Sequence, residues 1–311
     1  MKVLVLTTSY PPHGGSFVAE AVEAARSRGI EVAVVSPSSF RHFGIAAGHG
    51  MLGNLRARPW LVALLPLFLW NFRRAAARHD ADLVHAHWLV SGVVAATLRR
   101  PYVVQVWGTD VALLGRLPWR FPRVLAASRF LADAMGGVVV PTAVAIPAQI
   151  AEKDEGYVLF AGRLSPEKGI EEFLAASEGL PRLIVGGGPV DVPDGVGPVD
   201  DVGPYYERAA VVAVPSRREG YGMVAREAMA HGRVVVASAV GGLSDAIDDG
   251  VDGVLVPPRD VASLRAALER LLGDPELRAR LGAAARAKAE REWSREAMAD
   301  ALVRVYEEAV G

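Results

Sequence analysis

Two glutamates stand at a spacing that could serve a ligand. Glu219 and Glu227 have seven residues between them in the stretch PSRREGYGMVAREAMAHG, residues 215–232. Carboxylates accept hydrogen bonds from hydroxyl groups, so such a pair suits a hydroxyl-rich molecule such as a sugar. The spacing alone says little, because Glu23 and Glu31 repeat it elsewhere in the chain. The surroundings of the pair must therefore decide between a ligand site and two solvated acids.

The surroundings favour a ligand site. Glu219 follows the apolar run VVAVPS, which is typical of a buried strand, and Gly220-Tyr221-Gly222 then leads into the helical pattern MVAREAMAHG. The first N–H groups of a helix have no partner within it and lie at the positive end of its dipole, where they bind anions. We therefore expect Glu219, in the loop, and Glu227, inside the helix, to flank the phosphates of a ligand.

A cationic loop, FAGRLSPEKGI, contains the end of another apolar run, YVLFA at residues 157–161. Arg163 can bind a phosphate through two parallel hydrogen bonds, and Lys168 adds a point charge near a helix start. The alternative is an ordinary surface loop. Two cations placed after a strand predict a second contact to the same anion.

The loop after the first apolar run reads TTSYPPHGGSF. It lacks the G-x-G-x-x-G pattern, which argues against a nicotinamide or flavin dehydrogenase. Gly14 and Gly15 stand just before a helix, where bare backbone can approach an anion. A plain turn is the alternative.

These loops are positioned by two series of strands. In the first half, apolar runs alternate with alanine-rich helical stretches, and the runs are KVLVLTTS, EVAVVSPS, LVHAHW, YVVQVWG, RVLAAS and GVVVP. In the second half they are YVLFAGR, RLIVGGG, VVAVPS, RVVVAS and GVLVPP. Continuous apolar strands alternating with helices predict an α/β protein with doubly wound, Rossmann-like parallel sheets. Such sheets bind ligands beyond the carboxyl ends of their strands, so we expect two domains facing a central cleft.

The domain boundaries follow from where these patterns break. The segment TAVAIPAQIAEKDEG fits neither the strand nor the helix period, so we place a linker at residues 147–155. The linker separates a first domain, residues 1–146, from a second, residues 156–293. The last helix, residues 294–311, can return to the first domain.

The composition, 51% hydrophobic and 22% charged, is that of a globular protein. No cysteine is present, which excludes disulfides and thiolate chemistry. The start, MKVLVLTTSYPP, is typical of a first strand rather than of a signal peptide, so we expect a cytoplasmic protein.

The first half of the chain is basic: residues 1–150 hold 15 Lys or Arg against 7 Asp or Glu. This excess suggests that the first half meets a phosphate or another anionic surface.

The basic segment from Arg56 to Arg78 also carries Trp60, Leu64 and Phe68. Its apolar run is too short to span a bilayer. Such a segment can lie on a membrane surface, and a helix packed beside the acceptor cleft is the alternative. Peripheral contact with the inner face of a membrane is therefore a secondary expectation.

Three stretches together resemble family 4 of the retaining glycosyltransferases, whose members have the GT-B fold. They are FAGRLSPEKGI, the run from PSRREGYGMVAREAMAHG to GVLVPPRD, and DPELRARLGAAARAKAEREWS. The resemblance implies that Arg163 and Lys168 hold the diphosphate of a nucleoside diphosphate sugar. It also implies that Glu219 contacts the hydroxyls of the donor sugar and that Glu227 contacts the ribose, with Arg163, Lys168 and Glu219 as the catalytic residues.

The same resemblance assigns backbone groups to the donor. Amides would bind sugar and phosphate oxygens at Tyr221, Gly222, Met223 and Val224. Gly14 and Gly15 would face the same phosphates across the cleft.

The chain departs from the family in its first domain. Many members have a histidine before the G-[ST]-D of a strand-end loop, near the transferred sugar, where this chain has Trp107 in VQVWGTDV. Asp110 remains. His85 and His87, in LVHAHW, are the nearby candidates for a contact to sugar or acceptor, and a structural histidine is the alternative.

The resemblance implies a retaining glycosyltransferase that needs neither a metal nor a cofactor. The shortened segment before VVAVPS leaves the nucleotide base unassigned. A UDP-sugar is therefore only the first choice of donor, and a GDP-sugar is the second. The acceptor would be a carbohydrate, a lipid-linked or a small molecule, and no nucleic acid partner is expected. The alternatives are a sugar-nucleotide epimerase, a phosphorylase, or a protein that binds a sugar nucleotide without turnover.

Overall fold

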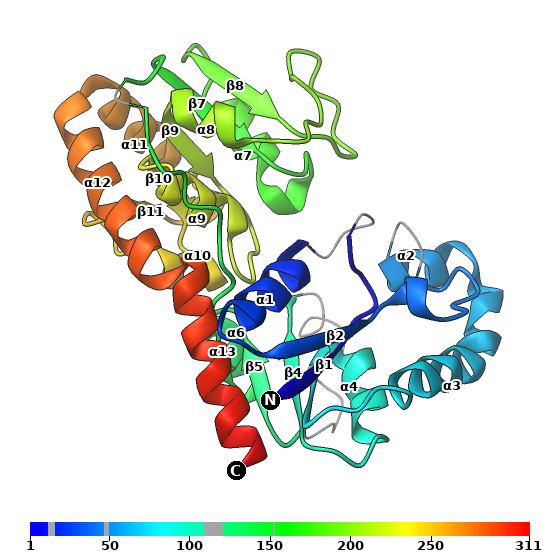
Figure 1. Ribbon diagram of the computed structural model, residues 1–311. Helices are drawn as coiled ribbons and strands as arrows, with labels where there is room; N and C mark the ends of the chain where they lie inside the picture. Colours follow the sequence, from blue (N-terminus) through cyan, green and yellow to red (C-terminus); the bar gives the residue numbers. More distant parts are fainter. Residues whose placement is uncertain (12–15, 47–49, 109–120, 152) are drawn as a thin grey trace. The chain divides into compact units, whose positions relative to one another are not determined.

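The computed structural model describes residues 1–11, 16–46, 50–108, 121–151 and 153–311. The chain divides into two compact units. Unit 1 comprises Met1–Ala143 and Arg295–Gly311, and unit 2 comprises Val144–Ser294. Each unit contains one sheet with helices packed against it (Figure 1).

Unit 1 is built on a six-stranded parallel sheet of order β2-β1-β3-β4-β5-β6. Its strands are β1 (Lys2–Leu6), β2 (Glu31–Val35), β3 (Leu83–His87), β4 (Tyr102–Val106), β5 (Val124–Ala126) and β6 (Val138–Val139). All residues of β3 and β5 are buried, as expected when helices cover both faces of a parallel sheet.

Alternate strand residues of unit 1 face two different helical layers. Val3 and Val5 pack in one cluster with α1 (Ser16–Ser27) and α13 (Arg295–Val310). Leu4 and Leu6 pack in another cluster with α3 (Leu65–Ala76) and α4 (Leu89–Ala96). The same cluster includes residues of α2 (Gly50–Ala57), α6 (Arg129–Met135) and the 3₁₀ turn η2 (Pro59–Leu64). Another 3₁₀ turn, η1 (Pro37–Ser39), follows β2.

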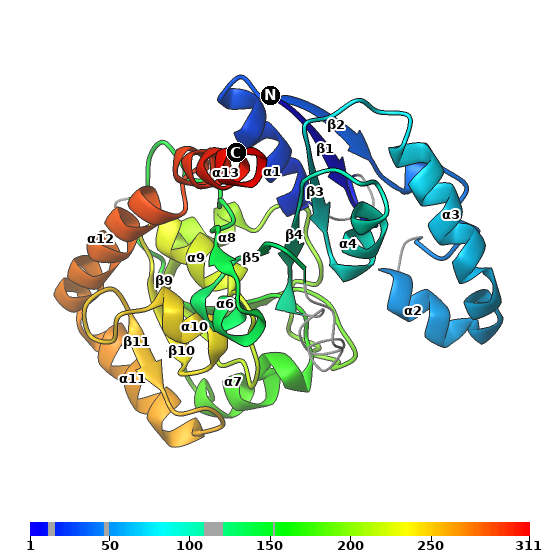
Figure 2. The same ribbon diagram turned by 90° about the horizontal axis from the view of Figure 1, so that it is seen from below.

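The last helix of the chain, α13, lies beside the first, α1 (Figures 1 and 2). Leu302 and Tyr306 of α13 are fully buried in the cluster that also holds Val3 and Val5. The hydroxyl of Tyr306 lies 2.7 Å from Nδ1 of His85 on β3. The C-terminal helix is thus part of the core of unit 1.

Unit 2 is built on a five-stranded parallel sheet of order β11-β10-β9-β7-β8. Its strands are β7 (Tyr157–Ala161), β8 (Arg182–Val185), β9 (Ala209–Val214), β10 (Val234–Ser238) and β11 (Val254–Val256). The eleven apolar runs of the sequence all form strands, so the predicted α/β fold with two doubly wound sheets is confirmed.

Two helical layers cover the sheet of unit 2 as well. One cluster joins α8 (Gly203–Arg208), α9 (Met223–Ala230), α10 (Gly241–Ala246) and α12 (Pro275–Glu292) to one face. The other joins α7 (Ile170–Ala176) and α11 (Val261–Gly273) to the opposite face. The order of the strands reverses between β7 and β9, so the loops beyond the carboxyl ends of these two strands form the switch point where such sheets bind ligands.

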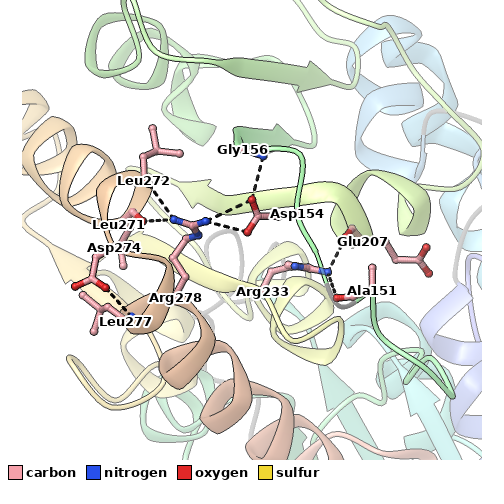
Figure 3. A network of polar contacts seen from close by, with 10 residues as sticks. All are labelled: Ala151, Asp154, Gly156, Glu207, Arg233, Leu271, Leu272, Asp274, Leu277 and Arg278. Atoms are coloured by element: carbon pink, nitrogen blue, oxygen red, sulfur yellow. Dashed lines mark hydrogen bonds and ion pairs between the residues drawn. The ribbon is translucent and has the colours of Figure 1, made fainter.

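Residues 147–151 and 153–155 of the predicted linker belong to unit 2 and are held there by arginines (Figure 3). Arg233 donates a hydrogen bond of 2.9 Å to the carbonyl of Ala151. Arg278 lies 3.0 Å from the carboxylate of Asp154, and this carboxylate also accepts from the backbone N–H of Gly156. The segment has no regular secondary structure, yet these side chains fix its path on unit 2.

Candidate functional site

The carboxyl ends of β7 and β9 bring a cation and a carboxylate together. Lys168 ends a 3₁₀ turn, η3 (Pro166–Lys168), in the loop after β7, and Glu219 lies in the loop after β9. Nζ of Lys168 lies 2.6 Å from Oε2 of Glu219. The side chains are 33% and 16% exposed, so both still reach solvent. This ion pair at the switch point is the centre of the candidate site.

Close backbone packing holds the Glu219 loop against η3. Gly169, which follows Lys168, has a φ of +74°, and a Cβ there would lie 1.9 Å from the carbonyl oxygen of Pro215. Only glycine fits this approach. The N–H of Arg217 also donates a hydrogen bond of 2.9 Å to the carbonyl of Glu167.

The other side of the same loop is held by a second glycine. Gly242, in the first turn of α10, would place a Cβ 2.3 Å from the carbonyl oxygen of Gly220. Its N–H donates a hydrogen bond of 3.0 Å to the carbonyl of Glu219. The Glu219 loop is therefore fixed between the loops of the two neighbouring strands, β7 and β10.

The start of α9 presents backbone N–H groups to this loop. Gly222 is the N-cap residue and has no side chain that could bond to them. The amides of Met223 and Val224 lie in the first turn of the helix, where N–H groups have no intrahelical acceptor. With the positive end of the helix dipole, these amides form an anion-binding element next to Glu219.

A buried arginine, Arg226, shapes the turn that precedes α9. Its guanidinium donates hydrogen bonds to the carbonyls of Tyr221 and Gly242. It also lies over the rings of Tyr221 and Trp293, at 3.8 and 4.7 Å from their centroids. This arginine was not predicted from the sequence to belong to the site. An arginine within the buried alanines of MVAREAMA is the signal that could have revealed it.

Glu227 lies one turn after Met223, the first residue of α9, and its side chain contacts another helix, α8. Its Oε2 accepts a hydrogen bond of 2.9 Å from the hydroxyl of Tyr206, on α8. Burial raises the pKa of Glu227, while the Tyr206 hydrogen bond lowers it. Tyr206 was also not predicted as a site residue. Its hydroxyl orients the carboxylate of Glu227, which was expected to contact the donor.

Arg163 lies two residues after the end of β7 and is exposed. Within the described ranges no carboxylate forms an ion pair with it, in contrast to Lys168. Its exposed guanidinium, in the same loop as Lys168, is available for a phosphate.

Three residues predicted in the first half, His85, His87 and Trp107, lie in unit 1, on strand β3 or just after strand β4. His85 and His87 are buried on β3 with their rings 4.3 Å apart, and the ring of His87 lies 6.0 Å from that of Trp107. Burial lowers the pKa of His85 to about 3 and that of His87 well below its ordinary value. Both imidazoles are therefore neutral near pH 7, and the hydrogen bond to Tyr306 gives His85 a structural partner.

Trp107 belongs to an aromatic cluster at this end of unit 1. The ring centroid of Phe17 lies 4.2 Å from that of Trp107, and the ring centroid of Trp88 lies 6.3 Å from that of Trp107. Trp88 has a φ of +66°, which is rare for a residue with a side chain and marks a strained strand end. Gly14, Gly15 and Asp110 lie outside the described residues.

Two protein families match this chain along most of its length. Residues 14–145 match the family described as Glycosyltransferase Family 4, and residues 155–274 match Glycosyl transferases group 1. The two matches cover segments from the first and from the second half of the chain.

Two curated relatives are D-inositol 3-phosphate glycosyltransferases. That of Acidothermus cellulolyticus is 30% identical over 85% of this chain and 79% of its own length. That of Saccharomonospora viridis is 38% identical, over 50% of this chain and 44% of its own length. The chain thus spans less than half of some relatives that it matches.

Solved structures share the fold at lower sequence identity. A sucrose-phosphate synthase from Thermosynechococcus elongatus has a TM-score of 0.81 and 23% identity, covering 99% of this chain and 98% of its own. HepE from Anabaena, solved in complex with UDP, has a TM-score of 0.75 and 21% identity, covering 99% of this chain and 100% of its own. On the sequence relationship and the architecture together, the chain belongs to glycosyltransferase family 4 and has the GT-B fold.

Proposed function

We propose that this protein transfers a sugar from a nucleoside diphosphate sugar to an acceptor hydroxyl, with retention at the anomeric carbon. The observation that carries the proposal is the Lys168–Glu219 ion pair at the β7/β9 switch point. It combines a cation for a diphosphate with a carboxylate for sugar hydroxyls, beside the helix start of α9.

Charge stabilisation of the leaving diphosphate is the catalytic contribution of unit 2. As the bond between the anomeric carbon and the diphosphate oxygen breaks, negative charge grows on that oxygen. In this proposal Arg163, Lys168 and the first N–H groups of α9 would stabilise this charge, which is usually the largest single contribution to such a reaction. The acceptor oxygen attacks from the same face, and its proton passes to the leaving phosphate oxygen.

The donor is a UDP-sugar in this proposal, with a GDP-sugar as the second choice. Support comes from HepE, a structural neighbour that was solved with UDP. Glu227, held by Tyr206, would accept a hydrogen bond from the ribose. A thermal-shift screen of UDP, GDP and ADP sugars would identify the donor, and a larger stabilisation by ADP or GDP sugars would contradict the UDP assignment.

A cytoplasmic location and independence of metal ions are parts of the same proposal. The cationic side chains would neutralise the diphosphate charge that a divalent ion neutralises in other transferases. Activity should therefore survive EDTA, and loss of activity that Mg²⁺ or Mn²⁺ restores would contradict this part.

Substitution at the switch point tests the function itself. Lys168→Ala and Arg163→Ala should each lower kcat about a hundredfold to a thousandfold, as removal of a charge-stabilising donor does in other enzymes. Lys153→Ala and Arg280→Ala, at exposed positions of unit 2, are the matched controls and should keep full activity. Turnover would be measured with the donor from the thermal-shift screen and an acceptor panel that includes D-inositol 3-phosphate.

Product analysis separates the alternatives with the same fold. Consumption of the donor without any acceptor would favour an epimerase, and dependence on free phosphate would favour a phosphorylase. Nucleotide binding without turnover on any acceptor would favour a binding protein, for which the replacement of the family histidine by Trp107 is the relevant observation.

A further inference from the structure

One surface of unit 1 exposes large apolar side chains. We call it the arginine–tryptophan surface, formed by η2, α3 and the arginines that flank them, within residues 56–78. Trp60 and Trp70 are 62% and 52% exposed, and Val62 and Leu67 are exposed as well. Exposed tryptophans in such a group are unusual on a surface that meets only water.

Helix α3 is apolar on two sides. Phe68 and Phe72 are fully buried against the sheet of unit 1, which accounts for one side. Leu67, Trp70 and Arg74 follow each other at spacings of three and four and form an outward stripe. The guanidinium of Arg74 lies 5.3 Å from the centroid of the Trp70 ring.

The charge of this surface has a single sign. No Asp or Glu occurs in the sequence between Glu31 and Asp80. The exposed arginines of the surface are Arg56, Arg58, Arg73, Arg74 and Arg78. None of these five pairs with a carboxylate in the part of the chain that the structure describes, so their charge is available to an anionic partner.

We propose that the arginine–tryptophan surface binds the surface of an anionic phospholipid bilayer. Tryptophan prefers the boundary between headgroups and acyl chains, and exposed aliphatic side chains can enter the same layer. Arginines around them bind lipid phosphates, each contributing to the attraction toward an anionic leaflet. A nucleic acid would use the arginines but leaves Val62 and Leu67 without a function.

This binding is peripheral. Among the residues that the structure describes, no helix combines the length and the apolar character needed to cross a bilayer. The surface belongs wholly to unit 1, whereas Lys168 and Glu219 lie in unit 2. The proposal therefore stands apart from the proposed sugar transfer.

Vesicle co-sedimentation of the full chain tests the proposal. The protein should bind vesicles of phosphatidylcholine mixed with phosphatidylglycerol and not vesicles of phosphatidylcholine alone, and rising salt should weaken the binding. Arg73→Gln with Arg78→Gln should reduce the vesicle partition coefficient about 25-fold, since each arginine contributes about fivefold. Arg270→Gln with Arg280→Gln, exposed on α11 and α12, removes the same charge from unit 2 and should leave binding unchanged.

The apolar part of the surface needs its own test. Trp60→Ala with Trp70→Ala should abolish the tryptophan quenching that brominated phosphatidylglycerol causes in the wild type. Val251→Ala, at a position of unit 2 that is 59% exposed, is the control. Equal melting temperatures would show that these exposed substitutions leave the fold intact.

Three results would overturn the proposal. They are equal binding to both kinds of vesicle, equal loss in the unit 2 control, and binding to a duplex oligonucleotide without preference for anionic vesicles. Turnover of a soluble acceptor should stay unchanged in all the arginine–tryptophan variants. Failure of the sugar-transfer proposal would instead appear in the Lys168 and Arg163 variants alone.

Discussion

Glu227 and Tyr206 form a contact whose effect on ligand binding depends on pH. Burial raises the pKa of the Glu227 carboxyl and the Tyr206 hydroxyl lowers it, so Tyr206→Phe should raise this pKa further. Because the carboxylate form is lost as pH falls through this pKa, UDP affinity should begin to decline at a higher pH in the variant than in the wild type. Calorimetric Kd values over a series of pH values would measure the difference.

Tyr205→Phe provides the matched control for this prediction. Tyr205 lies on the same helix, α8, and its ring contacts Arg208 rather than Glu227. Parallel affinity curves for wild type, Tyr205→Phe and Tyr206→Phe would contradict the role assigned to the Tyr206 hydroxyl.

His85 links the stability of unit 1 to pH. Its pKa is about 3 in the folded protein against an ordinary 6.5, because burial disfavours the charged imidazole. The unfolded chain therefore binds a proton that the folded chain does not. The contribution of the neutral His85 to the free energy of unfolding is fully present above about pH 6.5. It falls by about 1.4 kcal/mol per pH unit as the pH drops toward 3.

Urea unfolding between about pH 7.5 and pH 5 measures this dependence. His85→Gln should show a shallower decline of the unfolding free energy than the wild type. His79→Gln, at a partly exposed position, should keep the wild-type slope. Equal slopes in all three proteins would contradict the prediction.

At the residue scale, the sequence indicated the ionisable groups but not their partners. Lys168 and Glu219 were visible because each follows an apolar run. Their contact joins residues 51 positions apart, and the Glu227–Tyr206 contact joins residues 21 positions apart, so neither follows from local pattern. Arg226 was missed because a buried cation is recognised only by the carbonyls and rings that surround it.

At the scale of elements, the loop after β7 depends on Gly169. Gly169→Ala would add a Cβ 1.9 Å from the Pro215 carbonyl at a φ of +74°, so η3 must move and separate Lys168 from Glu219. Turnover should fall as in Lys168→Ala, and the melting temperature should fall because the packing of two loops is lost.

Gly179→Ala separates the effect of packing from that of backbone conformation. Gly179 has nearly the same φ, +75°, with no atom within 4 Å of an added Cβ. Its substitution should cost only the roughly 1–2 kcal/mol of a left-handed residue and leave turnover intact. A similar loss of activity in both variants would contradict the proposed role of the Gly169 contact.

The strands were predictable because residues of a parallel sheet are buried on both faces, which gives continuous apolar runs such as VVAVPS. The path of residues 147–151 and 153–155 was not predictable, because it depends on Arg233 and Arg278, which come from later in the chain. Irregular segments carry no period that a sequence could reveal.

At the scale of the whole molecule, neighbouring helices stabilise different units. Leu302 on α13 is buried in unit 1, and Leu281 on α12 is buried in unit 2. Either change to Ala leaves a cavity that costs about 2–5 kcal/mol. Leu302→Ala should speed hydrogen exchange in peptides of unit 1, and Leu281→Ala in those of unit 2. Equal acceleration in both units by either variant would contradict the division of the chain at residues 294 and 295.

The two glycines that enclose the Glu219 loop also limit how this protein can diversify. Because Gly169 and Gly242 press against the backbone on either side, the loop cannot be lengthened or exchanged without rebuilding both of its neighbours. New donor preferences would therefore arise by changing side chains on a constant backbone, and grafting this loop alone from a relative should fail.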